Sequence, residues 1–293
     1  MLTIEERLSS PTSGRGRMQR IVLDLLNEHR DSHALPTTVR FLFYELETRG
    51  VVRKSQQGES RRGSADDPRE QEVTDAATWL RDKGVVPWSW ILDEERTLYQ
   101  WDHARSVADY LKDRLEEATI NPWPELPPLV LSESKGLAGV LRAMVSEYVC
   151  PIAGTKGQVG GFLHTEIAPL LVDNSRAVFY LGDLDLQGEQ IETNSRRVLE
   201  RETGREIDWT RIAITRQQVA ERGLEPIWKT DNRYRPARDH QAVETEALGQ
   251  ATIRAMVREA FDDLLPQPLA DVQKEKNEEL PKWRNLLDGV DGD

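Results

Sequence analysis

The sequence predicts an α/β domain with a mostly parallel sheet, preceded by a smaller helical domain. Two observations lead to this fold class. From residue 129 onwards, short apolar runs alternate with stretches of helical spacing, as expected for parallel strands connected by helices. Before residue 96, three helical stripes are instead followed by a single extended ribbon. The proline-rich stretch at 121–128 suits neither a helix nor a central strand, so we place the domain boundary there.

The N-terminal part is predicted to contain three short helices. The spacing of its apolar residues places them at about 17–30, 38–49 and 68–83. Pro36 and the two threonines after it form a helix-start signal for the second helix. An extended ribbon at 85–91 follows the third helix. Three short helices with a ribbon indicate a winged helix-turn-helix, a fold that presents one helix to a nucleic-acid groove.

Length and composition fit two domains with ordinary cores. The chain has 293 residues, of which 38% are hydrophobic and 31% charged. No apolar run approaches the about 20 residues that a membrane helix needs. The single cysteine, Cys150, lies in a predicted apolar strand and excludes an internal disulfide, so we expect a cytoplasmic protein that does not enter a membrane. The expected parts are a winged-helix domain, a linker, an α/β domain and a charged C-terminal helix or tail, at 1–120, 121–128, 129–265 and 266–293.

Positive charge is concentrated in the N-terminal part. The first 65 residues carry 11 Lys and Arg against 8 Asp and Glu, whereas the whole chain carries 39 against 51. Such a local excess can contact nucleic-acid phosphates even in an acidic protein, although a solvated basic face has the same composition. The basic residues predicted to contact DNA are Arg40, Arg53, Lys54, Arg61, Arg62 and Lys135.

An acidic turn after a predicted strand carries the main functional signal. The apolar run 177–181 is followed by Asp183-Leu184-Asp185, after which helical spacing resumes. If Leu184 is extended, both carboxylates point the same way, at the edge of the sheet where ligands gather. Mg²⁺ would neutralise their repulsion, whereas the alternative is a solvated surface turn. An EF-hand is excluded, because a strand precedes the turn and the twelfth position is Asn194.

A third acid, Glu133, closes the earlier apolar run 129–132. A Glu that ends one strand and an Asp-x-Asp that ends a later one form a pattern that resembles the Toprim fold of topoisomerases, bacterial primases and several nucleases. The resemblance implies that Glu133 is a general acid/base beside the metal. It also implies that Asp183 and Asp185 hold Mg²⁺ with Glu133 as a further ligand, and that Mn²⁺ is an alternative ion.

The late segment Val243-Glu244-Thr245-Glu246-Ala247-Leu248 is similar to the Val-Glu-Leu-Asp-Ala-Leu segment of topoisomerase VI-like proteins. The resemblance implies that Glu244 and Glu246 lie by the metal site, with Glu246 as a ligand. The alternative is that both acids only orient Lys229 or Arg233 through ion pairs.

The second predicted helix carries Arg40-Phe41-Leu42-Phe43-Tyr44. This segment resembles the Arg-x-x-(aromatic)-Tyr segment in the A subunit of topoisomerase VI and in the related meiotic double-strand-break protein. The resemblance implies that Tyr44 attacks a DNA phosphate and that Arg40 assists. The two residues are four apart and therefore share one helix face. The alternative is that Tyr44 only packs in a small core.

These patterns predict a Mg²⁺-dependent enzyme that cleaves DNA strands, either by transesterification through Tyr44 or with a metal-activated water. Two alternatives remain: a catalytically silent DNA-binding regulator or scaffold, and a Toprim ribonuclease. The resemblance to topoisomerases implies a homodimer in which each tyrosine reaches the partner's metal. Because the sequence contains no ATPase motif, ATP-driven strand passage would require a separate ATPase subunit.

Overall fold

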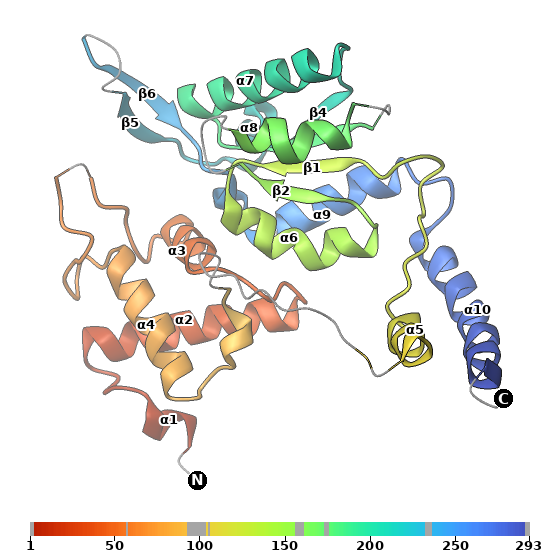
Figure 1. The fold of residues 1–293 in the computed structure, drawn as a ribbon. Coiled ribbons are helices and arrows are strands. Elements are labelled where there is room, and N and C mark those ends of the chain that lie inside the picture. The colour runs from red at the N-terminus through yellow and green to blue at the C-terminus, as the bar shows by residue number, and fades with distance from the viewer. Residues whose placement is uncertain are drawn as a thin grey trace.

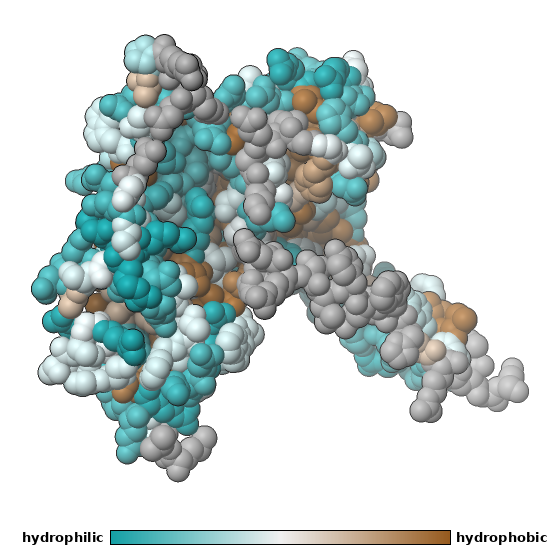
Figure 2. Space-filling model, turned by 60° about the vertical axis from the view of Figure 1, so that its left-hand side comes forward, coloured by the Kyte–Doolittle hydropathy of each residue, from teal (hydrophilic) through white to brown (hydrophobic). Residues whose placement is uncertain are grey.

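The computed structural model describes residues 3–56, 58–92, 104, 106–155, 161–172, 176–231 and 236–290. Figure 1 shows a helical N-terminal part beside an α/β part, with helices α5 and α10 extending away from the sheet. None of the helices in these ranges is long and apolar enough to cross a membrane. Figure 2 shows hydrophilic side chains over most of the visible face, with hydrophobic ones in separate patches.

The N-terminal part is built from helices, as predicted. The helices are α1 (Ile4–Arg7), α2 (Gly14–Asp31), α3 (Val39–Thr48) and α4 (Glu70–Asp82), with a 3₁₀ turn at Trp88–Trp90. Thr38 begins α3, because its hydroxyl accepts a hydrogen bond from the Phe41 N–H. The apolar faces of α2, α3 and α4 pack into one core. The ribbon expected at 85–91 is wrong, because Trp88–Trp90 form a 3₁₀ turn and only Ile91 forms a bridge, with Thr37. No strand occurs among the described residues of this part, so the winged helix-turn-helix stays a prediction.

The second part contains the predicted parallel sheet flanked by helices. Its strands are β1 (Leu129–Ser132), β2 (Ile152–Gly154), β3 (Val178–Leu181) and β4 (Trp209–Ala213), in the order β2-β1-β3-β4. All three pairings are parallel, so the strands end at one common edge. The strand expected to contain Cys150 begins only at Ile152, because Val149 has a left-handed backbone with φ 60°. Cys150 is buried in the turn before it.

Helices cover both faces of the sheet (Figure 1). Helices α6 (Lys135–Glu147) and α9 (Gln250–Asp262) pack on the face that contains Val130 and Phe179. Helix α7 (Leu186–Thr203) packs on the opposite face, and α8 (Arg216–Arg222) follows β4. Between β2 and β3, a π-helical turn at Leu163–Ile167 is followed by a 3₁₀ turn at Ala168–Leu170.

Two further pairs of elements extend from this core. Strands β5 (Ile227–Asp231) and β6 (Arg238–Ala242) form an antiparallel ribbon, followed by a 3₁₀ turn at Thr245–Leu248. Helix α10 (Leu269–Val290) packs along α5 (Val107–Leu115), and Lys112 Nζ lies 3.2 Å from Asp288 Oδ1. The charged C-terminal segment is therefore a helix docked on α5.

Candidate functional site

The carboxyl end of β3 brings together acids that are far apart in the sequence. Leu184 pairs with Val243 through two backbone hydrogen bonds of 2.9 and 3.1 Å. This bridge places Glu244 and Glu246 beside Asp183, whose Oδ1 accepts the Thr245 N–H at 2.8 Å. Carboxylate oxygens of Asp183, Glu244 and Glu246 lie within 4.8 Å of one another, so this acid triad can hold a metal ion.

Glu246 is the least satisfied member of the acid triad. Its side chain is fully buried, and Arg40 Nε lies 2.8 Å from Oε1 without pointing at it in hydrogen-bond geometry. Neither carboxylate oxygen has a hydrogen-bond partner among the described residues. Leaving a buried carboxylate in this state is costly, because it has lost its water and gained no hydrogen bond. A cation coordinated by the triad would complete its surroundings.

The pKa values in the triad reflect burial and crowding of negative charge. Burial, and then the charges of Glu244 and Glu246, raise the pKa of Asp183 well above its ordinary value. Burial also acts to raise the pKa of Glu244, but a hydrogen bond with Asp183 and the charges of Lys54, Lys229 and Arg40 hold it far below its usual range. Burial and the neighbouring carboxylates therefore favour the protonated form of Asp183.

Glu133 and Asp185 lie beside the triad, and both oxygens of Asp185 are already engaged. Asp185 caps α7, since its Oδ1 accepts the N–H groups of Gln187 and Gly188 at 2.9 and 2.7 Å. Its Oδ2 accepts Lys229 Nζ at 2.8 Å. Burial acts to raise the pKa of Asp185, but Lys229 and the Gly188 amide outweigh burial and lower it. The role of Asp185 as a metal ligand stays a prediction.

Glu133 contacts the acidic turn through the backbone. Its Oε2 accepts the Asp183 N–H at 3.2 Å, and burial raises its pKa, with the charge of Asp185 adding to the effect. Gly188 is required nearby, because a Cβ there would lie 2.3 Å from the Asp183 carbonyl oxygen. A raised pKa suits a general acid/base, and that role of Glu133 stays a prediction.

A cavity of about 650 Å³ separates these acids from helix α3 and the chain that follows it. The acidic wall contains Glu133, Asp183, Asp185 and Glu244. The opposite wall carries the phenol of Tyr44 and the cationic groups of Arg40, Lys54 and Arg61, together with one acid, Glu70.

Glu244 is the residue that joins the two walls of the cavity. Its Oε1 lies 2.8 Å from Lys54 Nζ and 3.1 Å from Lys229 Nζ, and its Oε2 accepts Arg40 at 3.0 Å. The expected ion pair with Lys229 is present, whereas Arg233 lies outside the described residues.

Tyr44 lies in this cavity and also in the helical core. It is 5% exposed, packs edge-on against Phe43, and its oxygen accepts Lys54 Nζ at 2.7 Å. Arg40 lies over its ring, so the two residues share one face as predicted. Burial, and then the charge of Glu244, raise the pKa of Tyr44, with Arg40 opposing them. The phenol is therefore protonated in this arrangement.

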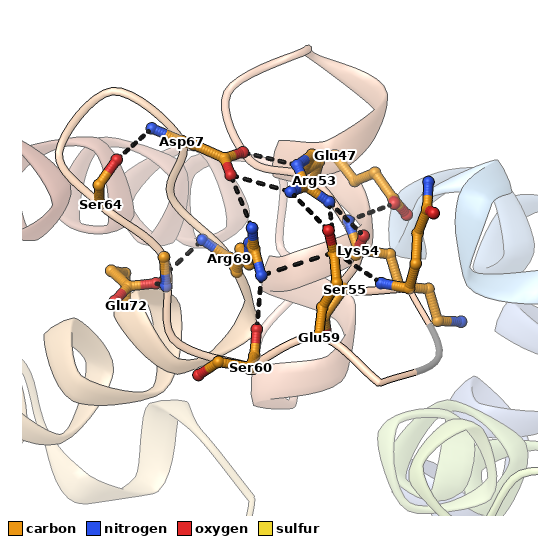
Figure 3. A network of polar contacts seen from close by, with 12 residues as sticks. Glu47, Arg53, Lys54, Ser55, Glu59, Ser60, Ser64, Asp67, Arg69 and Glu72 are labelled. Atoms are coloured by element: carbon orange, nitrogen blue, oxygen red, sulfur yellow. Dashed lines mark hydrogen bonds and ion pairs between the residues drawn. The ribbon is translucent and has the colours of Figure 1, made fainter.

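Other predicted DNA contacts are engaged elsewhere. Arg53 lies between Glu59 and Asp67, at 2.8 and 2.6 Å, within a polar network that ties together residues 53–72 (Figure 3). Arg62 pairs with Asp75 at 2.7 Å, and Lys135 is exposed at the first turn of α6, away from the residues that line the cavity. The Arg53 network positions its neighbour Lys54, whose amine enters the cavity.

Two contributions go beyond what was expected from the sequence. Lys229 forms the expected pair with Glu244 and also contacts Asp185, which depends on the ribbon β5–β6. Arg211 donates to the carbonyl oxygens of Gly182, Asp183 and Ile214 at 2.6, 2.8 and 2.8 Å. The sequence signal for the role of Arg211 was its position as a charged residue in an otherwise apolar strand.

Comparisons with known proteins identify no relative. No family model, curated protein or solved structure matches this chain, so its function must be inferred from the geometry of these residues.

Proposed function

We propose that this protein is a metal-dependent enzyme that cleaves phosphodiester bonds in DNA. The observation that carries the proposal is the acid triad, in which buried Glu246 has an ion pair with Arg40 but no hydrogen-bond partner among the described residues, beside a cavity that cationic side chains line. Three carboxylates are the ligands that Mg²⁺ and Mn²⁺ prefer. A phosphodiester is the complementary substrate, because it binds to cationic groups on one wall and to a metal on the other.

The residues of the chain supply binding and proton transfer. Arg40, Lys54 and Lys229 are close enough to Glu244 to stabilise negative charge on a phosphate that enters the cavity. Glu133, whose pKa is raised, is suited to pass a proton to the leaving oxygen. A divalent ion on Asp183, Glu244 and Glu246 would polarise the phosphate when bound.

The attacking group is either Tyr44 or a water molecule. Lys54 already donates to the Tyr44 oxygen, and removing negative charge from Glu244 would make the phenol easier to ionise. With Tyr44 the product is a protein–DNA bond, whereas with water the reaction is hydrolysis. The arrangement of acids at the ends of β1 and β3 supports a Toprim-like domain. The homodimer and the ATPase partner are proposed from the resemblance alone.

Cleavage of supercoiled plasmid in Mg²⁺ or Mn²⁺ tests the proposal. We expect Asp183→Asn and Glu246→Gln to abolish nicking or linearisation, while Glu221→Gln, on an exposed face of α8, leaves it intact. If Tyr44→Phe retains activity, the reaction is hydrolysis. If Tyr44→Phe is inactive and the wild-type protein can be trapped covalently bound to DNA, the reaction is transesterification. Metal-dependent cutting of RNA but not DNA would identify a ribonuclease. Absence of cutting under conditions of DNA binding would overturn the proposal in favour of a regulator.

A further inference from the structure

A second cavity lies on the other side of Asp185. Its volume is about 250 Å³, and it is bounded by the acidic turn, the start of α7, helix α8 and the ribbon β5–β6. Its walls are largely aliphatic, from Leu184, Val219, Pro226 and Val243. At the mouth, Arg216 pairs with Glu189 at 2.8 Å, and both side chains are well exposed. The cavity is therefore apolar inside and polar at its mouth.

His240 contributes a polar group whose binding capacity is unused. Both ring nitrogens are buried, and neither has a hydrogen-bond partner among the described residues. His240 lies opposite Lys229 across the ribbon, so the two side chains lie on the same face. Lys229 contacts Asp185 and Glu244, whereas His240 lines the second cavity. A neutral imidazole offers one donor and one acceptor, and buried polar groups of this kind normally have partners.

We propose that this cavity receives an unpaired base of the nucleic acid, a substrate class that rests on the proposed phosphodiester cleavage. Asp185 lines both cavities, so a base bound here belongs to a nucleotide beside the scissile phosphate. Aliphatic walls suit the flat faces of a base, and the His240 nitrogens suit its hydrogen-bonding edge. An apolar protein side chain would leave both nitrogens unsatisfied. A phosphate is disfavoured by the aliphatic walls, because they would remove its water without forming hydrogen bonds to it.

Binding measured without cleavage tests this site. Fluorescence anisotropy in EDTA compares a labelled duplex that carries one unpaired nucleotide with the same duplex carrying an abasic residue at that position. We expect the wild-type protein to bind the first about tenfold more tightly, as base stacking and edge contacts allow. Val219→Trp fills the cavity and should remove the difference, while affinity for fully paired duplex stays the same. Ala220→Trp, at the exposed neighbouring position, should retain it.

A second variant covers the case in which Val219→Trp does not fold. His240→Phe keeps a ring of similar size without the nitrogens and should reduce the preference for the base several-fold. Equal binding of the two duplexes by the wild-type protein, or an undiminished preference in both variants, would overturn the inference. Because no metal is needed, a protein that prefers the unpaired base yet never cuts plasmid would refute the cleavage proposal and leave this site standing.

Discussion

Lys54, from the N-terminal helical part, donates to Glu244 Oε1 at 2.8 Å across 190 positions of sequence. Arg40 approaches the other oxygen of Glu244 from the same part. The acid triad is thus neutralised in part by side chains of the other domain, and a metal ion has to compete with them for Glu244. Once a metal ion has taken Glu244 from Lys54 and Arg40, these two cationic side chains can bind the substrate phosphate instead.

Lys54→Met should tighten divalent metal binding. The substitution removes a positive competitor for Glu244, while the Lys54 side chain is only 33% exposed. We expect the Kd for Mn²⁺, measured by electron paramagnetic resonance, to fall about two- to fivefold, and DNA affinity to fall as well. Lys135→Met, at an exposed position, is the control and should leave Mn²⁺ affinity as it is. Unchanged or weaker Mn²⁺ binding in Lys54→Met would contradict this competition.

Arg211→Lys should loosen the acidic turn. The guanidinium donates to three carbonyl oxygens around Asp183 and pairs with Glu192, and a single ammonium cannot reproduce this geometry. We expect a loss of about 3 kcal/mol in the free energy of unfolding, measured in urea, because buried carbonyl groups lose their partners.

The control for Arg211 is the exposed Arg216, whose pair with Glu189 lies at the surface. Arg216→Lys should change stability by less than about 0.5 kcal/mol. Weaker Mn²⁺ binding in folded Arg211→Lys, with normal binding in Arg216→Lys, would show that Arg211 positions the triad. Equal effects of the two substitutions would contradict that role.

Local signals predicted much of the fold, whereas the site depends on contacts between distant segments. Thr38 predicted the start of α3, and apolar runs predicted β1 and β3, because helix capping and strand burial depend on residues that are neighbours in the sequence. The bridge between Leu184 and Val243 could not be predicted from neighbouring residues, because it joins two segments that are far apart in the sequence. Glu244 was therefore expected near the metal by resemblance, with an ion pair to Lys229 as the alternative, whereas its contacts with Arg40 and Lys54 emerged only from the folded chain.

Low pH should destabilise the loop that carries Lys54. Arg53 lowers the pKa of both Glu59 and Asp67 to about 2, below the ordinary values near 4. These carboxylates stabilise the folded loop at pH above their unfolded pKa, and this contribution is lost as the pH falls through about 2. Hydrogen exchange of residues 53–69, corrected for its intrinsic pH dependence, should therefore accelerate between pH 4 and 2.

Arg53→Ala should produce the same destabilisation at neutral pH, because it removes the partner of both carboxylates. Arg30→Ala, which removes an exposed pair with Asp31 and a contact with the Trp90 ring, both outside this loop, is the matched control. Since the Arg53 network is exposed to solvent, high salt should also weaken it. Protection that persists in Arg53→Ala would show that other contacts, such as those of Arg69, hold the loop.

Stabilisation by a bound metal ion should distinguish the two candidate ligand sets, which are the acid triad and the set that includes Asp185. If Asp183, Glu244 and Glu246 hold the ion, Mn²⁺ at about 100 times its Kd stabilises the protein by about 2.7 kcal/mol, and Glu246→Gln abolishes this gain. Asp185→Asn should retain most of it, because asparagine still caps α7 and Asp185 is already bound to Lys229. Thermal unfolding with and without Mn²⁺ measures the difference, with Glu221→Gln as the control. Loss of the gain in Asp185→Asn but not in Glu246→Gln would instead assign the ion to Glu133, Asp183 and Asp185, the set that the Toprim resemblance implies.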